Sequence, residues 1–338
     1  MRLKLLMPNY QPPFTLNNTI LGLVADIGNL VGRLSVEFEQ SQLRLRKVNR
    51  MRTIQGSLAI EGNTLSEQQI TAILDGKRVL APPKEVQEAR NAIAVYEQLP
   101  HWQAQSEFNL LAAHKLLMLG LVDEAGQYRS GGVGVMSGNR VVHMAPQAER
   151  VPKLMRDLLS WLGNTDAHAL ISSCVFHYEF EFIHPFADGN GRMGRLWQTL
   201  ILARWQPIFA NIPVESLVYQ HQEDYYRAIR ESTALGESTP FIEFMLQMIL
   251  AAVTELIGHQ HDGVNDGVND GVNLSELPAL QQQILAVLRK APKMTIQQLV
   301  EETGKSTRTI ERHLKALRQA KAIERIGSDK TGYWKVIV

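Results

Sequence analysis

The chain has 338 residues, of which 45% are hydrophobic, so it is too long for one small core and is expected to form two or three domains. The formal net charge is only +1, but residues 274–338 carry 12 Lys and Arg against 6 Asp and Glu, whereas the rest of the chain carries 23 against 28. A neutral total therefore combines an acidic body with a basic C-terminal segment, which points to a polyanion as the partner of that segment.

The sequence favours a cytoplasmic protein. The first 14 residues have only a short apolar stretch, which three prolines interrupt, and this is not the pattern of a signal peptide. The single cysteine, Cys174, cannot form an internal disulfide, and we expect a buried side chain in a reducing compartment. Segment 241–258 is apolar but contains Glu243, Gln247 and Glu255, so we expect a packing helix and no membrane span.

Helical periodicity dominates the sequence. Apolar residues from Ile20 to Leu34 recur at spacings of three and four, as on one amphipathic helix. A second helix is expected from about residue 41 to residue 60, and it should end at Glu61-Gly62, where glycine can take the left-handed capping conformation. Further helices are predicted at 84–98, 106–119, 149–163, 167–182, 191–205 and 239–258.

One segment departs from the helical pattern. Residues 131–146, GGVGVMSGNRVVHMAP, contain two short apolar stretches around Ser137-Gly138-Asn139, which favours a β-hairpin. A hairpin on a helical body has free strand edges, and such an edge can bind an extended peptide by strand addition. The spacing alone is equally compatible with a plain connecting loop.

The stretch HPFADGNGRMGR, residues 184–195, concentrates polar groups directly before a helical run. The glycines of Gly189-Asn190-Gly191 allow backbone N–H groups to converge, and the helix N-terminus adds partial positive charge, which together suit a phosphate. Arg192 and Arg195 are three residues apart, on one face of the first turn, and each can bind phosphate oxygens with two parallel N–H groups. The stretch therefore predicts a polyphosphate site.

An acid and a histidine precede the glycines. Asp188 beside a polyphosphate needs a cation between them, and Mg²⁺ typically combines carboxylates with substrate phosphates. His184 is a suitable general base near a phosphoryl group, and because Pro185 disfavours helix, we expect His184 in an extended conformation. A calcium loop that begins at Asp188 is excluded, because Arg192 and Thr199 would take ligand positions five and twelve, which need oxygen ligands such as carboxylates. A P-loop is excluded because Gly-Lys-Ser/Thr does not follow the glycines.

The C-terminal part begins with a repeat. DGVNDGVNDGVN, residues 262–273, is rich in turn formers and predicts a flexible linker over 259–274. Residues 275–338 then show three helices, the second with Thr295 as N-cap and Gly304 as its end, and two alternating strands. This pattern is typical of a winged helix-turn-helix, used for DNA or only for protein contacts. The basic third helix would present to a DNA groove Ser306, Thr307, Arg308, Arg312 and Lys315.

The stretch from His184 to Arg195 resembles the Fic motif, HxFx(D/E)GNGRxxR, at every defined position. The resemblance extends over roughly residues 10–255. It implies a mainly α fold: a Fic-type helical bundle with a β-hairpin flap, here followed by a small winged-helix domain. It also implies an enzyme that transfers AMP from ATP to a hydroxyl of a target protein and releases pyrophosphate.

The resemblance assigns a role to each motif residue. His184 would deprotonate a Ser, Thr or Tyr hydroxyl of the target, Asp188 would hold Mg²⁺, and the hairpin 131–146 would dock the target segment. The ATP phosphates would be bound by Gly189, Asn190, Gly191, Arg192 and Arg195. Tyr225 and Tyr226 fall where Fic proteins often line the adenine pocket, although aromatic residues on a helix usually belong to the core.

A second stretch, Ser57-Leu-Ala-Ile-Glu61-Gly62, resembles the Fic inhibitory motif (S/T)xxxE(G/N). From spacing alone, Glu61 near the end of a helix is most simply a solvated surface carboxylate. The resemblance implies instead that Glu61 reaches the second motif arginine, Arg195, so that ATP binds in a non-productive pose. Because this motif precedes the catalytic motif, the chain is similar to the class with an N-terminal inhibitory helix, here at about 41–62.

These expectations divide the chain into an N-terminal helical region (1–100), a Fic core (101–258), a linker (259–274) and a winged helix (275–338). Three other activities stay open: a DNA-binding transcriptional regulator with a nucleotide-sensing Fic domain, an enzyme that removes AMP, and a kinase-like transfer, against which the intact motif argues. The expected partners are ATP with Mg²⁺, a target protein and DNA. The apolar faces of the N-terminal helices suit a homodimer or core packing equally.

Overall fold

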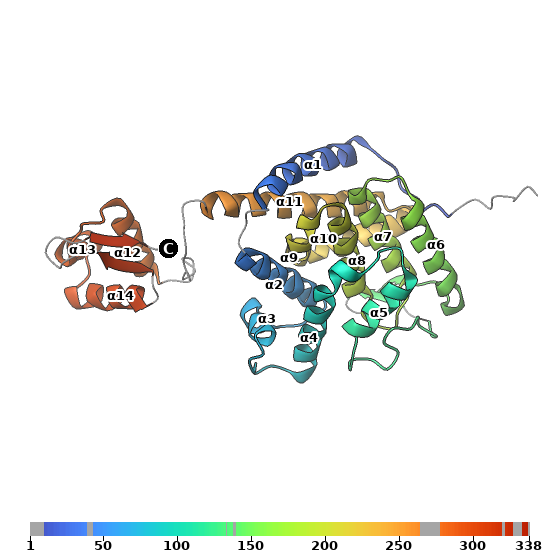
Figure 1. Ribbon diagram of the computed structural model, residues 1–338, viewed down its shortest axis with the longest axis horizontal. Coiled ribbons are helices and arrows are strands. Elements are labelled where there is room, and N and C mark those ends of the chain that lie inside the picture. Colours follow the sequence, from blue (N-terminus) through green and yellow to red (C-terminus); the bar gives the residue numbers. More distant parts are fainter. Residues whose placement is uncertain are drawn as a thin grey trace, which may run out of the picture. The chain divides into compact units, whose positions relative to one another are not determined.

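A computed structural model describes residues 10–38, 43–132, 134–137, 140–263, 278–319, 322–326 and 333–336. The chain divides into two compact units, Met1–Leu256 and Ile257–Val338. Helices make up most of both units, and each unit has one small two-stranded sheet (Figure 1). The prediction of a mainly α fold with a β-hairpin and a winged-helix part is confirmed.

The predicted long helices of the first unit all form, with ends that differ by a few residues. Three further helices, the short α3 and α9 and the 14-residue α10, were not predicted. The elements up to the second strand are α1 Asn18–Phe38, α2 Leu43–Ile60, α3 Glu67–Leu74, α4 Pro83–Glu97, α5 Glu107–Leu117, β1 Gly134–Ser137 and β2 Arg140–Met144. The elements after it are α6 Val151–Asn164, α7 Ala169–Ile183, α8 Asn190–Trp205, α9 Val214–Gln220, α10 Gln222–Leu235 and α11 Thr239–Gly263.

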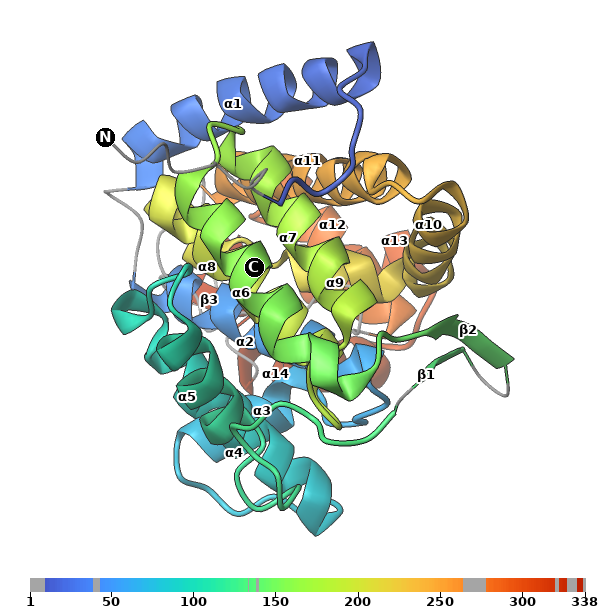
Figure 2. The same cartoon turned by 90° about the vertical axis from the view of Figure 1, so that its right-hand side faces the viewer.

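Helices α7 and α8 form the centre of the first unit (Figure 2). Almost every residue of α7 is buried, as expected for the sequence ALISSCVFHYEFEFI, which is apolar on all sides, and its cysteine, Cys174, is a free buried thiol. The two helices pack directly against each other. A Cβ at Gly194 of α8 would lie 2.8 Å from the His177 ring of α7, so this close approach requires glycine.

Strands β1 and β2 pair as an antiparallel hairpin. The register joins Gly134 to Met144 and Ser137 to Arg140, and it shifts between Val135 and Met136 as at a β-bulge. The hairpin predicted within 131–146 is therefore confirmed, and the alternative of a plain loop is wrong. Figure 2 shows it projecting from the helices, between α5 and α6 in chain order.

Helix α11 is longer than predicted. It continues to Gly263, so residues 259–263 of the predicted linker are helical. Once a helix is formed, each further residue adds a backbone hydrogen bond at little cost, which outweighs the weak propensity of the repeat. Residues 264–274 lie outside the described part of the chain. Among the described helices, α11 alone is long and apolar enough to span a membrane, and half of that window is buried inside the structure.

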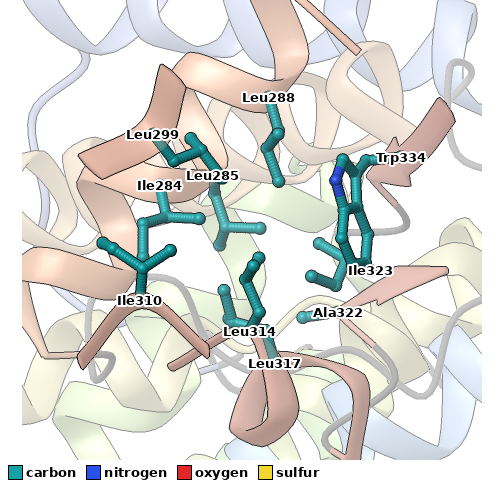
Figure 3. Packing of buried hydrophobic residues seen from close by; sticks show 10 residues of the cluster. All are labelled: Ile284, Leu285, Leu288, Leu299, Ile310, Leu314, Leu317, Ala322, Ile323 and Trp334. Carbon is teal, nitrogen blue, oxygen red and sulfur yellow. The ribbon is translucent and has the colours of Figure 1, made fainter. Parts of the chain in front are cut away.

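The second unit has its own core (Figure 3). Its elements are α12 Ala279–Lys290, α13 Ile296–Thr303, α14 Thr307–Gln319, β3 Ile323–Ile326 and β4 Tyr333–Val336. Thr295 caps α13 in a capping box with Gln298, and Gly304 ends the helix with φ 64°, as predicted. Trp334 of β4 closes the apolar cluster against the antiparallel partner strand β3 and the three helices.

Candidate functional site

The loop between α7 and α8 carries the predicted catalytic histidine. His184 ends α7 with φ 49° and ψ 63°, and it is the one non-glycine residue with positive φ in the described part of the chain. The prediction of an extended His184 is therefore wrong, although the helix does end there. The proline that follows excludes only the helical region, and hydrogen bonds on both sides select the left-handed one. The His184 N–H donates to Phe180 O (2.9 Å), and the His184 carbonyl accepts from Arg129 Nε (2.7 Å).

A histidine of α5, His114, contacts the loop between α7 and α8 and helps to hold it in place. His114 stacks on the fully buried Phe186, with ring centroids 3.6 Å apart and an interplanar angle of 3°. The Gly126 N–H donates to His114 Nδ1 (2.8 Å), so Nε2 carries the proton and donates to the Asp188 carbonyl (3.0 Å). Burial lowers the pKa of His114 to about 4, so the ring is neutral at physiological pH. Sequence reasoning missed His114, because a histidine in an apolar helix carries no separate signal.

The anion site is predicted at the N-terminus of α8. The first hydrogen bond within the helix runs from Met193 N–H to Gly189 O (3.0 Å), so the amides of residues 190–192 have no acceptor within the helix. Gly189 has φ 84°, and a Cβ there would lie 2.7 Å from Met118 Sδ, so only glycine fits. The Asn190 side chain turns to the backbone N–H and carbonyl of Phe186, both at 2.9 Å. It therefore holds the loop, and Asn190 offers a phosphate its backbone amide.

Asp188 lies at the edge of this anion site with its side chain half exposed. Its Oδ1 accepts from Gly189 N–H (2.6 Å) and lies 3.4 Å from Arg192 Nη2. The described residues contain no group of three His, Cys, Asp or Glu side chains that could hold a metal ion alone. One accessible carboxylate does fit Mg²⁺ when the remaining ligands are phosphate oxygens and water.

The two motif arginines are both buried but contact different helices. Arg192 lies with Nη1 3.6 Å from Glu88 Oε1 of α4, and Glu88 also accepts from the Asn63 side chain (2.9 Å). Sequence reasoning missed Glu88, since an isolated glutamate on a polar helix face is usually solvated. Its contact connects the first motif arginine to the residues just after Glu61-Gly62.

Arg195 is held by the stretch that resembles the inhibitory motif. Its Nη2 donates to Glu61 Oε1 (2.6 Å) and to the Ser57 carbonyl (3.1 Å), and its Nε donates to Ser57 Oγ (3.2 Å). Burial lowers the pKa of Arg195, but Glu61 first, with Tyr225 and Glu181, together raise it more, so the net shift is upward. Gly191 leaves room for Glu61 directly beside the N-terminus of α8, where a Cβ would collide with the carboxylate.

A second carboxyl lies behind the loop. Glu181 of α7 is 7% exposed, its Oε2 is 3.8 Å from His184 Nδ1, and its Oε1 has no hydrogen-bond partner among the described residues. Burial raises the pKa of Glu181 to about 8, although Arg195 opposes the shift. This group therefore binds a proton well above the ordinary pH range of a carboxyl.

The two predicted adenine-site tyrosines lie close together on α10. Tyr225 is 2% exposed, its hydroxyl lies 3.1 Å from His177 Nε2, and its ring contacts Phe241. Tyr226 is less buried, and its pKa is raised by burial first and by the charge of Glu61 second. His177 Nδ1 in turn lies 2.7 Å from Gln198 Oε1, within hydrogen-bond distance.

Four of the predicted DNA-contact residues lie on α14, and Ser306 lies directly before it. Ile310, Leu314 and Leu317 point into the core of the second unit. The exposed positions include all five predicted ones: Ser306, Thr307, Arg308, Arg312 and Lys315. Helical spacing thus separates an apolar face from a basic face.

Comparisons with known proteins place these features in two families. Residues 104–202 match the Fic/DOC family model, and residues 277–324 match a winged helix-turn-helix DNA-binding model. A curated relative, protein adenylyltransferase Fic of Nematostella vectensis, is 32% identical over 56% of this chain and 44% of its own length. Another, protein adenylyltransferase fic-1 of Caenorhabditis elegans, is 30% identical over 60% of this chain and 40% of its own. The chain thus spans less than half the length of these curated relatives.

A solved structure covers nearly the whole chain. A Fic family protein from Desulfovibrio desulfuricans G20 is 48% identical, covers 97% of this chain and 98% of its own, and superposes with a TM-score of 0.75. The match includes both units of the chain. With the motif loop, the hairpin and the winged helix in place, this protein belongs to the Fic/DOC family and carries a C-terminal winged helix-turn-helix.

Proposed function

We propose that this protein is an autoinhibited protein adenylyltransferase, which transfers AMP from ATP to a Ser, Thr or Tyr hydroxyl of a target protein. The observation that carries the proposal is the position of His184 at one end of a six-residue loop whose other end opens the anion site of α8. A base and a polyphosphate site at the two ends of one short loop would be close enough for the transfer. The curated relatives are named for this activity.

In the proposed reaction, the amides of residues 190–192 and Arg192 bind the phosphates of ATP. His184 accepts the proton of the acceptor hydroxyl, whose oxygen forms a bond to the α-phosphorus, while the bond from that phosphorus to the pyrophosphate oxygen breaks. Asp188 would hold Mg²⁺, which neutralises phosphate charge. The hairpin β1–β2 would align the target segment by strand addition. ATP and a reducing compartment both suit a cytoplasmic location.

Glu61 would restrain this reaction. Its carboxylate occupies the donor of Arg195 and the space above Gly191, so an outer phosphate of ATP cannot bind there at the same time. ATP would then bind with its α-phosphate misaligned for the acceptor hydroxyl. Removal of Glu61 leaves a buried cation without its carboxylate, which a phosphate can replace.

The test is labelling with α-labelled ATP and Mg²⁺, comparing wild type, Glu61→Gly and Glu61→Gly/His184→Ala. We expect label on the protein itself or on a lysate protein in Glu61→Gly, and loss of that label by about 100-fold or more when His184 is also replaced. Glu97→Gly is the matched control, because Glu97 is an exposed glutamate at the end of another helix, α4.

Two results would contradict the proposal. Absence of label from all four proteins would favour the regulator with a nucleotide-sensing domain. Label from γ-labelled but not α-labelled ATP would show phosphoryl transfer.

A separate experiment tests whether the protein removes AMP from a target protein. A target that already carries AMP is incubated with wild type or with Glu61→Gly, and the released AMP is measured. Faster release by wild type than by Glu61→Gly would assign the reverse reaction to this site.

The exposed basic face of α14 favours a second function, binding of DNA. Arg308, Arg312 and Lys315 lie at spacings of four and three on one side of the helix, while its other side packs in the core. A helix so placed can enter the major groove and contact phosphates and base edges.

A further inference from the structure

Arg129 connects the catalytic loop to both ends of the hairpin. It lies between α5 and β1, and it is 3% exposed. Its Nε donates to the His184 carbonyl (2.7 Å), and its Nη2 donates to the Ile183 carbonyl (3.3 Å). Its backbone N–H donates to the Pro185 carbonyl (2.9 Å). Three successive carbonyls around the left-handed turn are therefore fixed by one residue.

The same guanidinium reaches the hairpin. Nη1 donates to the Gly131 carbonyl (2.8 Å), three residues before β1 begins, and Nη2 donates to the Pro146 carbonyl (2.5 Å), two residues after β2 ends. No ion pair with Arg129 is found among the described residues, so carbonyl oxygens take up its donors. Burial lowers the pKa of Arg129 and Glu149 raises it, but a guanidinium stays charged.

The guanidinium of Arg129 donates hydrogen bonds to carbonyls of three segments: the loop after α7, the segment before β1 and the segment after β2. A buried group with this set of contacts is suited to fixing the distances between these segments. The positive φ of His184 is an unfavourable conformation that persists only where surrounding contacts hold it. The bonds to carbonyls 183 and 184 supply such contacts. The bonds to carbonyls 131 and 146 tie the start and the end of the hairpin to the same planar group.

We infer that Arg129 is the positioning residue that sets the hairpin, and with it the docked target segment, at a fixed distance from the His184 imidazole. This inference rests on the proposed AMP transfer. Arg129 touches neither ATP nor the acceptor; it acts through the backbone of the loop and the hairpin. Its loss should impair transfer to a protein hydroxyl and leave ATP binding intact, because none of its hydrogen bonds goes to residues 188–195.

The experiment uses the full chain in the Glu61→Gly background, with Arg129→Leu and Arg129→Lys. Protein labelling from α-labelled ATP should fall by about 10-fold or more in Arg129→Leu, because small misplacements of reacting groups have effects of this size. Arg129→Lys keeps the charge but not the fork of donors, and it should recover part of the rate. The KM for ATP should stay within about two-fold in both. Arg150→Leu is the control, since Arg150 is exposed close to the same hairpin.

Hydrogen exchange provides a readout that does not need the activity. In Arg129→Leu we expect faster amide exchange at 183–187 and at 131–146, with exchange in α6 and α10 unchanged. If the Glu61→Gly parent fails to label any protein, the proposed function fails, and the exchange result still decides the role of Arg129. Normal labelling in Arg129→Leu, or a uniform rise in exchange with an equal loss of ATP affinity, would overturn the inference and leave Arg129 a general structural residue.

Discussion

At the scale of single residues, the site contains a buried cation, Arg195, whose carboxylate partner, Glu61, could be replaced by another anion. Arg195 is 2% exposed, whereas the Glu61 side chain that neutralises it is 35% exposed. The cation is therefore enclosed by the protein, while the carboxylate is partly accessible to solvent. Breaking such a pair costs free energy because the buried cation is left alone, until another anion takes the place of the carboxylate.

This exchange predicts how ATP changes stability. Glu61→Gly should lower the melting temperature without nucleotide by a few degrees, corresponding to about 1 kcal/mol for a partly exposed pair. ATP with Mg²⁺ should then stabilise Glu61→Gly more than wild type, because Arg195 is available to the phosphates. Thermal unfolding of both proteins at several ATP concentrations measures this. Equal ATP-dependent shifts in the two proteins would show that Glu61 and the nucleotide do not compete, and Glu97→Gly should behave as wild type.

Glu181 predicts a pH dependence of stability. Its pKa in the folded protein is about 8, against 4.5 for an ordinary glutamate, so the folded state binds its proton more tightly than the unfolded state. The stability that this proton contributes is fully present below pH 4.5 and is lost as the pH rises toward 8. Glu215, with its pKa raised by burial to about 7, acts with the same sign.

The measurement is thermal unfolding from about pH 5 to about pH 8. Glu181→Gln keeps the shape of the side chain and cannot titrate, so its melting temperature should fall less over this range than that of wild type, by about 2 °C or more. Glu97→Gln, at an exposed position, should follow wild type. Parallel curves for wild type and Glu181→Gln would mean that Glu181 titrates normally in the folded protein.

At the scale of elements, the contact between Glu61 and Arg195 depends on how closely α2 lies against its neighbours. Gly56 of α2 faces the start of α9, where a Cβ would lie 2.7 Å from Glu215 C and Ser216 N. Backbone atoms cannot move aside as a flexible side chain would. The glycine therefore allows a close approach of the two helices. This approach brings Ser57, the next residue, and Glu61, about one turn after Ser57, to Arg195.

A methyl group at position 56 should separate these helices. Gly56→Ala is expected to shift α2, to weaken the contact between Glu61 and Arg195 and to raise labelling from α-labelled ATP several-fold, though less than Glu61→Gly does. Stability should fall by about 1–3 kcal/mol, as in overpacked cores. Gly28→Ala is the matched control, because a Cβ at this helical glycine of α1 meets nothing within 4 Å. Lower stability of Gly56→Ala with unchanged labelling would show that the packing of α2 against α9 does not control the proposed restraint by Glu61.

The elements also show what the sequence could and could not predict. Long periodic segments such as α1 and α7 were found, because their apolar patterns are read locally. The short α3 and α9 were missed, since seven or eight residues give too few turns for a period, and the 14-residue α10 was missed because its largely polar sequence has few apolar positions. The contacts of Arg129 and His114 with the loop that carries His184 join segments 50 or more residues apart, which local patterns do not contain. The catalytic motif was recognisable because its residues are contiguous.

At the scale of the whole molecule, the two units carry different charges and separate cores. The apolar cluster of the second unit is formed within residues 284–334. Its basic face on α14 needs no residue of the first unit to form. Changes on that face should therefore affect DNA binding and not the transfer reaction.

Arg312→Ala in the full chain should weaken binding to random-sequence duplex DNA. Loss of one phosphate contact should also reduce the slope of log K against log salt by about 1, measured by fluorescence anisotropy between about 50 and 200 mM salt. In the Glu61→Gly background, labelling should be unchanged by Arg312→Ala. Arg90→Ala removes the same charge from an exposed position of the first unit and is the control. Equal slopes for wild type and Arg312→Ala would exclude α14 as the DNA-contacting helix.

The single hydrogen bond from Arg195 to Glu61 has a thermodynamic consequence for the proposed enzyme. If ATP and the inhibitory helix exclude each other at Arg195, any molecule that holds α2 away from this arginine must raise the affinity for ATP by some factor. By reciprocity, saturating ATP must raise the affinity for that molecule by the same factor. The cellular ATP concentration and the fraction of protein that has such a molecule bound at α2 are then coupled, so that a change in either one changes the other.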